Sequence, residues 1–415
     1  MTIGRTGGLD PWFGAAPDYG AEIAAWPASI ALLDQPHSRL RPVFSVSEGD
    51  WVAAGDTLYR DRRRPELHYV APAAGIVAEI RRGPRRSFEQ LLLTVDGDAA
   101  RTFALPDHLD AETLTALLVE SGLWTSLRTR PFERVPRPGT RPDALFVTAI
   151  DTRPLAPDPA RIIAPRADWF ARGLAALSLL SAGKTWLCHK AGTDLPRAEG
   201  VEAMGFSGPH PAGLVGTHIH RLHPVGAGGT VWHISYQEVI AIGHLLTTGR
   251  IWTSRVVGLA GDGVARPALL ETHPGADLHD LCKDRLVDGP VRLLSGSPLE
   301  GQAGRYLEAG HMQVSVLRHR AISANHGWLA HARDWLSRGS GAILPNALHE
   351  RAAPPGILAI PFLRAISVGD VETAQRLGAL ELAEEDLALL THVDGGSTDF
   401  GRLLRGVLDT LEEAS

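Results

Sequence analysis

Cysteine is scarce in this chain, which has only Cys188 and Cys282 among its 415 residues. Two cysteines so far apart cannot build a disulfide framework, and they cannot hold zinc or an iron–sulfur cluster without other ligands. A reducing cytoplasm is therefore the compartment that the sequence favours.

An excess of positive charge and long apolar runs are lacking as well. The chain has 41 Lys and Arg against 47 Asp and Glu, a net charge of −6 with His neutral, whereas nucleic-acid-binding proteins normally carry a basic face. A membrane-spanning helix needs roughly 18–20 apolar residues, and the best candidate, residues 239–246, is interrupted by Gly243 and His244. The N-terminus lacks the apolar core of a secretory signal. We expect neither a nucleic-acid partner nor a membrane-spanning segment.

Glycine and proline are plentiful instead, with 44 and 29 residues, which predicts many short elements joined by sharp turns. At roughly 100–200 residues per domain, the length predicts several domains. We expect a multidomain protein of the α+β and α/β classes with four parts: an N-terminal β module over residues 1–104, a Rossmann-like α/β domain over 105–250, a small mixed, β-grasp-like domain over 251–325, and C-terminal helices over 326–415.

Short alternating runs in the first part are separated by Gly-Asp turns, as in tightly connected β-strands. The pattern V-x-E-G-D-x-V-x-x-G-D-x-L over residues 46–58, followed by A-P-x-x-G-x-V over 71–77, resembles the barrel-sandwich fold of lipoyl and biotinyl carrier domains. Those carriers hold a modifiable lysine at a hairpin tip, but the tip here, residues 60–65, contains no lysine. The scaffold is therefore expected without the swinging-arm function.

Two groups of arginines fall at predicted turns of this module: Arg60 with residues 62–64, and residues 81–82 with 85–86. Charge runs of this kind are usually solvated surface. The alternative is docking against an acidic partner or anionic lipid headgroups.

From about residue 106, helices and strands alternate. Asp110 is a plausible N-cap for an amphipathic helix, a strand over 144–150 runs into Asp151, and a helix near 169–180 precedes an apolar run at 185–188. This alternation predicts a doubly wound sheet, in which ligands bind beyond the carboxyl ends of the strands. Asp151 occupies such a position.

Two nucleotide-binding signatures are incomplete. Residues 181–185, Ser-Ala-Gly-Lys-Thr, resemble the end of a P-loop, but Ser178 stands where the motif needs glycine. The Gly-Asp-Gly at 261–263 lacks the third glycine of a dinucleotide fingerprint. These residues therefore give no sign of NADH binding by the chain itself.

Four histidines, His210, His218, His220 and His223, occur within 14 positions. Imidazole is the commonest metal ligand, and on a strand His218 and His220 would share a face. No Asp, Glu or Cys lies inside the cluster to complete an open metal site. We therefore favour a loop clamped by Pro and Gly, whose histidines hydrogen-bond backbone, a neighbouring domain or an oxygenated ligand. A metalloenzyme unrelated to respiration is the rival.

Two later segments each allow a functional and a structural interpretation. Gln237 and Glu238 follow an expected strand-to-helix junction, where they either bind a polar ring substituent or occupy the first helical turn. The final helix, with an apolar stripe from Leu403 to Leu411, either seals the fold or contacts a partner. We favour the structural interpretation of both.

Five strings resemble one family: residues 8–10 with 14–15, 121–132, 146–152, 208–220 and 237–243. They are closely similar to the NqrA family of the Na+-translocating NADH:quinone reductase, in register over roughly residues 7–320 and again near 368–370 and 380–382. The long string from Gly208 to His220 is the most specific.

The resemblance implies a peripheral subunit on the cytoplasmic face of a bacterial inner membrane, docked on the other subunits and especially on a membrane-embedded one. The family's complex oxidises NADH, reduces ubiquinone and exports sodium, and its other subunits hold the flavins and iron–sulfur centres. The chain itself is then expected to bind no redox cofactor and to be inactive alone, with ubiquinone as a candidate ligand. A non-catalytic scaffold, in that complex or in a related Rnf-type assembly, is the alternative.

The family also resembles the flavin subunit of respiratory complex I, in which the segment equivalent to residues 121–132 is a glycine-rich loop that approaches the FMN phosphate. Trp124, Thr125, Leu127 and Thr129 replace those glycines here, and residues with a Cβ block the approach. The replacement predicts that this chain binds no FMN. Other departures are residues 318–350, which are shorter than in the family, and 390–395, where the family often has two cysteines.

Candidate residues for binding quinone or a partner subunit are polar groups in loops shaped by Gly and Pro near expected strand ends. They are Arg128, Arg130, Asp151, His210, His218 and His220. The two arginines would orient a quinone carbonyl or bind a neighbouring subunit's carboxylate, and a histidine would share the protons of the quinol. No residue is assigned as catalytic or as a metal ligand.

Overall fold

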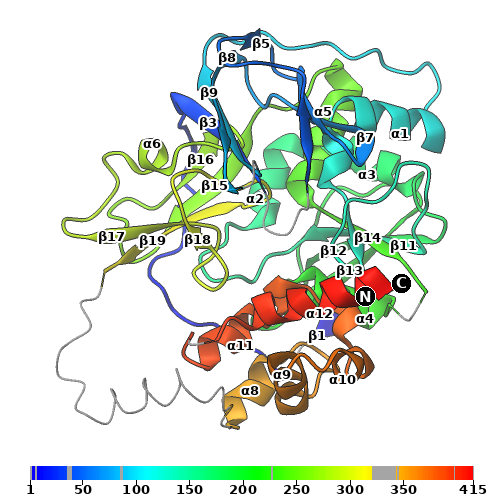
Figure 1. The fold of residues 1–415 in the computed structure, drawn as a ribbon, viewed down its shortest axis with the longest axis vertical. Helices are drawn as coiled ribbons and strands as arrows, with labels where there is room; N and C mark the ends of the chain where they lie inside the picture. The colour runs from blue at the N-terminus through cyan, green and yellow to red at the C-terminus, as the bar shows by residue number, and fades with distance from the viewer. Residues whose placement is uncertain are drawn as a thin grey trace.

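A computed structural model describes residues 2–4, 7–34, 40–84, 87–225, 228–319, 343, 345–396 and 398–414. Its strands form four sheets, and its last helices form a separate layer at the bottom of Figure 1. The multidomain α+β architecture is confirmed. The boundary predicted between residues 325 and 326 lies outside the described residues.

The N-terminal module consists of two facing antiparallel sheets at the top of Figure 1. One has the order β3 (Ser29–Leu33), β9 (Phe88–Val95), β8 (Gly75–Arg82) and β5 (Trp51–Val52). The other has the order β4 (Pro42–Phe44), β6 (Thr57–Asp61) and β7 (Arg64–Val70). Alternate residues of these strands, such as Leu58, Val77, Leu91 and Leu93, are buried between the sheets.

Residues 2–27, which the prediction assigns to the same module, contribute strands to two other sheets. β1 (Thr2–Gly4) pairs in parallel with a strand of the α/β domain, and β2 (Glu22–Ala24) with a strand of the small domain. Between them, the carbonyls of Phe13 and Ala15 accept hydrogen bonds from Asp262 and Gly261. The N-terminal segment therefore ties these domains together through long-range pairing, which local alternation does not reveal.

The α/β domain has a six-stranded sheet of order β1-β13-β12-β11-β14-β10. β11 (Ala144–Ala149), β12 (Lys184–Lys190), β13 (Val201–Ser207) and β14 (Val231–Ser235) are parallel, and β10 (Arg128–Arg130) is an antiparallel edge. After β11 the chain proceeds to β12 and β13 on one side and then returns to β14 on the other. The point where the strand order reverses therefore lies between β11 and β14, as in a doubly wound sheet.

Helices cover both faces of this sheet, so its strands are buried on both sides. They are α1 (Ala111–Glu120), α2 (Pro159–Ile163), α3 (Ala167–Ser178), α4 (Val215–Leu222) and α5 (Tyr236–Thr248). α3 and α5 pack with Leu145 and Val147 on one face, and α4 packs with Phe146 on the other. Asp110 caps α1 as predicted, through bonds from Glu112 N and Thr113 N at 3.0 and 2.9 Å.

Gly173 of α3 and Gly243 of α5 lie where these two helices meet. A Cβ at Gly243 would stand 1.7 Å from Trp169 O, and one at Gly173 would stand 2.0 Å from Val239 O. The glycine that interrupts the apolar run at 239–246 is therefore required for helix packing.

The small domain has the order β18-β17-β19-β15-β16-β2, at the left of Figure 1. Its strands are β15 (Arg255–Ala260), β16 (Ala268–Thr272), β17 (Val291–Ser295), β18 (Gln302–Ala303) and β19 (Gln313–Arg318), with the short helix α6 (Leu278–Cys282). β15 pairs in parallel with β19 and antiparallel with β16, so the predicted mixed character is confirmed.

The C-terminal region packs helices around its own apolar core, which includes Phe362, Leu363, Leu404 and Leu408. Its helices are α8 (Ala347–Ala352), α9 (Ala359–Ser367), α10 (Val371–Arg376), α11 (Ala388–Val393) and α12 (Phe400–Ala414), with 3-10 turns at Ala379–Glu381 and Glu384–Leu387. The stripe of α12 faces this core, which confirms the packing interpretation. In the described parts of the chain, no helix is both long and apolar enough to span a membrane.

Candidate functional site

Two arginines, Arg130 fully buried and Arg153 half-buried, stand where the α/β sheet meets the C-terminal region. Arg130, the last residue of β10, is 0% exposed, and its guanidinium contacts Glu133 in the next turn, Glu385 Oε1 at 3.3 Å and Asp386 Oδ2 at 3.6 Å. It also lies 3.1 Å from Nε2 of His233 on β14. Glu385 and Asp386 belong to the 3-10 turn Glu384–Leu387, so Arg130 joins the end of the sheet to the C-terminal region.

Arg153 continues this network from the loop after β11. Its guanidinium lies 3.2 Å from Asp151 Oδ2 and also contacts Glu300 of the small domain and Glu385 of the C-terminal region. Arg153 N donates to Asp151 Oδ1 at 2.9 Å. One guanidinium therefore connects carboxylates from three regions of the chain.

Negative charge exceeds positive charge in this network. Its carboxyl groups belong to Glu133, Asp151, Glu300, Glu385 and Asp386, whereas only Arg130 and Arg153 are cationic. Burial raises the pKa of Glu300 and of Asp386 to about 7, and the charge of Glu385 adds to the effect. Burial also raises the pKa of Asp151. Part of the network therefore holds protons near neutral pH.

The pKa values of Glu385 and His233 are lowered instead. Burial would raise the pKa of Glu385, but the charges of Arg153 and Arg130 outweigh it and lower that pKa. Burial, and then the charge of Arg130, lower the pKa of His233 well below its ordinary value, so the imidazole is neutral. Glu385 is consequently the carboxylate that stays ionised between the two guanidinium groups.

The turn after β10 has a strained backbone. Phe132 and Glu133 have φ angles of 77° and 57°, a region that residues other than glycine seldom adopt. Contacts from both sides hold this turn, since Arg405 Nη1 donates to Phe132 O at 3.0 Å and the Glu133 carboxylate lies 3.0 Å from His233 Nε2. Such strain persists only where the surroundings over-determine the conformation.

Two further arginines reinforce the attachment of the C-terminal region. Arg405 of α12 is 3% exposed and pairs with Glu384 through two bonds of 2.6 and 2.7 Å. Arg134 reaches Asp409 and Glu412 of the same helix at 2.8 and 2.7 Å. The C-terminal region thus docks through arginine–carboxylate pairs.

The loop from Gly208 to Leu214 packs directly on the carboxyl end of β11. His210 is 1% exposed, its backbone N donates to Asp10 Oδ1 at 2.9 Å, and its Nδ1 lies 3.3 Å from Thr152 Oγ1. A Cβ at Gly213 would stand 2.6 Å from Thr152 N, so this close approach requires glycine. The position where a doubly wound sheet usually presents its ligand is filled here by the chain itself.

Residues 215–222 form helix α4, which corrects the expectation of a loop through this stretch. His218 and His220 are two positions apart, so on a helix they point in different directions. His218 is 0% exposed, its Nε2 lies 3.1 Å from Ala212 O, and its ring is 4.2 Å from that of Phe206. Burial lowers the pKa of His218 to about 3, so it serves as a neutral core residue.

His220 faces the C-terminal region instead. Its Nδ1 lies 2.8 Å from Glu381 Oε2. Gly356, with a φ of 77°, packs over the ring, and a Cβ there would stand 2.5 Å from His220 Cε1. The expectation of a histidine that contacts a neighbouring domain is confirmed at this position.

Arg128 is held by its own loop. Its guanidinium donates to Thr125 O and, at 2.9 Å, to Leu127 O. Burial lowers its pKa, while the charges of Tyr69 and Glu238 act in the other direction. Arg128 and Arg130 are two positions apart on β10, and the charges of both lower the pKa of His233.

The structure therefore connects four of the six candidates through side chains, although the backbone of Arg130, which pairs with Val231, lies at the opposite end of the sheet from Asp151. Arg130 and Asp151 are linked through Arg153 and Glu385, Arg128 stands on the same strand as Arg130, and His210 is attached through Thr152. His218 and His220 lie on α4, with separate contacts.

Comparison with known proteins decides the family. The chain matches the family models of the NqrA N-terminal barrel-sandwich hybrid domain over residues 6–96, the NqrA second alpha/beta domain over 109–251 and the NQRA C-terminal domain over 256–305. It is 42% identical to the NqrA subunit of the Na(+)-translocating NADH-quinone reductase of Pseudomonas aeruginosa, with 98% of each chain covered. The chain belongs to the NqrA family.

Other relatives agree with this assignment. The NqrA of Yersinia pestis is 41% identical with 98% of each chain covered, and that of Neisseria meningitidis is 41% identical with 92% of this chain and 93% of the relative covered. Among solved structures, an NAD+-reducing [NiFe]-hydrogenase aligns with a TM-score of 0.39 at 13% identity, covering 72% of this chain and 60% of that chain. This last likeness is too weak to support an argument.

Trp124, in the segment 121–132, is part of the hydrophobic core. Trp124 is 0% exposed, and its ring meets that of Trp232 edge to face at 5.5 Å. Its Nε1 donates to Pro136 O at 2.9 Å. The indole therefore occupies the space between this segment and β14.

The residues singled out after β14 join domains. Gln237 is 0% exposed and exchanges two hydrogen bonds with the backbone of Val256, at 2.6 and 3.0 Å. Glu238 accepts from Arg255 at 2.7 Å and from Ser126 at 3.0 Å. The structural interpretation of this pair is confirmed.

A metal site in the histidine stretch would need at least three ligands that converge on one point. In the described ranges of the chain, no group of three or more His, Cys, Asp or Glu side chains is arranged to hold a metal ion. The histidines of the 208–223 stretch are instead separated by their different contacts.

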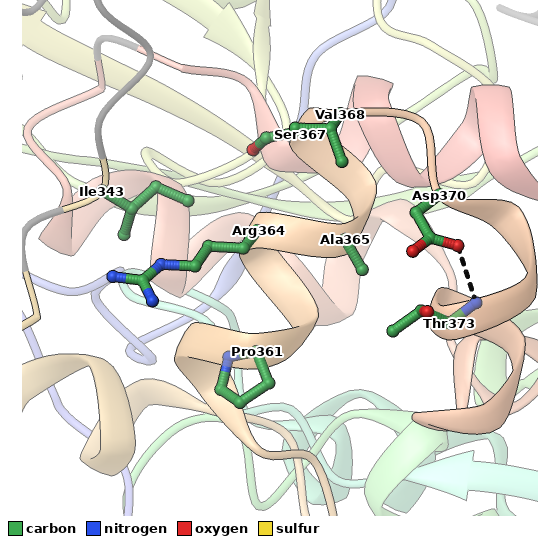
Figure 2. A pocket seen from close by; sticks show the side chains of 8 residues that line it. All are labelled: Ile343, Pro361, Arg364, Ala365, Ser367, Val368, Asp370 and Thr373. Atoms are coloured by element: carbon green, nitrogen blue, oxygen red, sulfur yellow. Dashed lines mark hydrogen bonds between the residues drawn. The ribbon is translucent and has the colours of Figure 1, made fainter.

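One hollow lies on the C-terminal helices and contains none of the six candidates. It has a volume of about 470 Å³ between α9 and α10 (Figure 2). Val368 at its rim is 80% exposed, and Asp370 accepts from Thr373 N at 3.0 Å as the cap of α10. The lining residues are Ile343, Pro361, Arg364, Ala365, Ser367, Val368, Asp370 and Thr373.

Sequence reasoning missed most of the partly buried charge network, namely Glu133, Arg153, His233, Glu300, Glu385 and Asp386. A signal was present in the run Glu384-Glu385-Asp386, which is flanked by apolar residues that the C-terminal core buries. Three carboxylates between core positions need buried cations, and arginines beside the predicted strand ends were candidates to supply them.

Proposed function

We propose that this chain serves as the NqrA subunit of a Na+-translocating NADH:quinone reductase, a translocase that couples NADH oxidation and ubiquinone reduction to sodium export. The observation that carries the proposal is 42% identity to the Pseudomonas aeruginosa relative over 98% of both chains. Within the complex, the chain acts as a peripheral subunit on the cytoplasmic face of a bacterial inner membrane, docked on a membrane-embedded partner, and is inactive alone.

The comparison also favours this function over a scaffold of an Rnf-type complex, because the curated relatives carry the name of the sodium-translocating quinone reductase. Finer resemblances belong to the same proposal. The parallel order β13-β12-β11-β14 supports a Rossmann-like domain, which we propose to be related to the flavin subunit of complex I. The mixed sheet with α6 supports a β-grasp-like small domain.

The six candidate residues are proposed to act at a quinone or partner interface. Arg130, Asp151 and His210 support the shape of this region from inside, since they are bonded to neighbouring segments of the chain. His220, whose side chain is 30% exposed, is the better placed of the histidines to meet an incoming group. A photoreactive quinone on the assembled complex should then label residues 121–153 or 208–220, and labelling confined to other subunits would contradict the quinone role.

The function is tested by assembling the membrane complex with and without this chain. NADH-dependent ubiquinone reduction and sodium uptake into vesicles are expected to fall to background without it and to return when the purified chain is added. Oxidation of NADH by a water-soluble electron acceptor is expected to persist, because the flavins reside in other subunits. Full quinone reduction by a complex that lacks the chain would contradict the proposal, and loss of the other subunits on purification would favour a scaffold.

The chain is further proposed to carry no redox cofactor. The purified chain should show no flavin absorbance and release no flavin on denaturation, because Trp124 fills the segment that a flavin phosphate would need to approach. The measurement is an absorption spectrum of the chain purified alone and after incubation with FMN. A stoichiometric, tightly bound flavin would overturn the prediction.

A further inference from the structure

The structure separates the arginines of the N-terminal module into engaged and unengaged groups. Arg64 donates to Val135 O and Pro136 O, both at 2.6 Å, and so fastens the module to the α/β domain. Arg81 forms two bonds with Glu79 at 3.0 and 2.9 Å. Both guanidinium groups are therefore engaged within the chain. Arg85 and Arg86, which the sequence places in the second group, lie outside the described residues.

Four other arginines converge on one hollow of about 700 Å³ between β4, the β6–β7 turn and the end of β8. The hollow is lined by Asp34, Leu40, Arg41, Pro42, Val43, Arg62, Arg63, Arg82, Ser87 and Phe88. All four arginines are exposed. We call this feature the arginine hollow.

The guanidinium groups of the arginine hollow differ from those of Arg64 and Arg81 in their contacts. Among the residues that the structure describes, no carboxylate forms an ion pair with any of its four guanidinium groups. The neighbouring Asp61 accepts instead from the backbone N of Arg41 and of Arg63, at 3.3 and 3.1 Å. Arg82 stacks over the ring of Phe44 at 5.2 Å. Asp34 is the one acidic side chain in the lining.

The backbone holds these arginines together. Arg62 N donates to Arg41 O at 2.8 Å, which fixes the turn against the start of β4. Like charges that converge in this way repel one another unless an anion lies between them. The convergence also runs against the net charge of −6 of the whole chain.

Guanidinium groups favour phosphate, because their planar donors match two oxygens of one phosphate at once. The rim of the hollow is also apolar, since Val43 is 53% exposed beside the arginines. A cationic site with an apolar rim fits the boundary between lipid headgroups and acyl chains.

We propose that the arginine hollow binds the phosphate groups of anionic phospholipids and sets the N-terminal module against the membrane surface. The choice of lipid over a soluble phosphate rests on the proposed attachment to a membrane complex. The contact with lipid is a property of this chain alone and needs no other subunit.

The test is sedimentation of the full-length chain with vesicles of phosphatidylcholine alone or mixed with phosphatidylglycerol. The chain should bind the mixed vesicles, ignore the neutral ones and dissociate at high salt. Each basic side chain near an anionic surface strengthens binding roughly fivefold, so the triple variant Arg62→Glu, Arg63→Glu, Arg82→Glu should bind at least about a hundredfold more weakly. Its thermal unfolding should match that of the native chain, because these side chains are exposed.

A matched control reverses three exposed arginines elsewhere, Arg172→Glu, Arg197→Glu and Arg221→Glu, and so changes the net charge equally. The control should keep most of the vesicle binding. An equal loss of vesicle binding in both triple variants, or a native chain that shows no preference for anionic vesicles, would overturn the proposal.

Two further outcomes would also overturn it. If pyrophosphate binds the chain but vesicles do not, the hollow is a site for a soluble anion. If the native chain ignores vesicles and the Arg62, Arg63 and Arg82 reversals block copurification with the other subunits in detergent, the hollow docks an acidic protein surface. Because the vesicle assay contains no other subunit, a negative result leaves the proposed function untouched.

Discussion

An Arg130→Met variant is expected to lose about 3–5 kcal/mol of stability at pH 8, because removal of one partner from a buried charge network leaves the others uncompensated. Arg130 is fully buried and contacts Glu133, Glu385 and Asp386. Methionine fills a similar volume but offers no charge. The C-terminal region, which supplies two of these carboxylates, is therefore expected to detach before the rest of the chain unfolds.

The measurement is urea unfolding combined with amide hydrogen exchange across α8 to α12. Exchange in these helices should accelerate, while that in β11 and β12 changes much less. Adding Glu385→Gln to Arg130→Met should restore part of the loss, because it removes one of the stranded charges. Arg172→Met, at an exposed position on α3, is the control and should change stability by less than about 0.5 kcal/mol. Equal stability of Arg130→Met and the native chain would mean that the network contributes nothing to docking.

Elements with a strong local pattern could be predicted from the sequence. The helix capped by Asp110, the strand before Asp151 and the apolar stripe of α12 carry their signals within a dozen residues. The barrel-sandwich module was visible for the same reason, because its short alternating runs and Gly-Asp turns recur within a few residues of one another.

Long-range partners could not be predicted in this way. Nothing near Thr2 or Glu22 indicates that these short strands join two different sheets. The stretch around His218 shows a related limit, since its Gly and Pro residues suggested a loop whereas residues 215–222 pack as a helix against the sheet.

The candidate site was located in part. Polar residues at strand ends led to Arg130 and Asp151, although these strand ends lie at opposite ends of the sheet and only side-chain contacts through Arg153 and Glu385 join them. The carboxylates that face them come from residues 300, 385 and 386, and their approach depends on how the domains dock. Domain docking also determines whether Asp386 and Glu300 are ionised, because it is burial that raises the pKa of these two carboxyl groups.

The stability of the docked C-terminal region is expected to fall as the pH rises from about 5 to about 8. Burial raises the pKa of Asp386 and of Glu300 to about 7, whereas an unfolded Asp or Glu titrates near 4. Between these values the folded chain holds more protons than the unfolded chain, so a rise in pH favours unfolding. The pKa of Glu385 is lowered, so its contribution to stability is lost at lower pH.

An Asp386→Asn variant should lose a large part of this pH dependence. An amide carries no charge at any pH, and its oxygen can still accept the hydrogen bond from Ala383 N, which Asp386 Oδ2 receives at 2.8 Å. The free energy of unfolding of the variant should match that of the native chain at pH 5 and exceed it by roughly 1–2 kcal/mol at pH 8. This gain is well below the limit that a shift of about three pKa units would set. The 3.6 Å contact with Arg130 is a small loss, because Glu385 continues to pair with that guanidinium.

The measurement is urea unfolding of both chains at intervals from pH 5 to pH 8, with Asp288→Asn as an exposed control that should keep the native slope. A variant that is less stable than the native chain at pH 8 would mean that Asp386 is ionised and its pairing with Arg130 is favourable. If the free energy of unfolding falls more steeply with rising pH in the native chain than in Asp386→Asn, docking is coupled to proton uptake at this carboxyl group. Because Asp386 also stands against Gly216 at the start of α4, the same proton would then link the C-terminal region to the helix that carries His218 and His220.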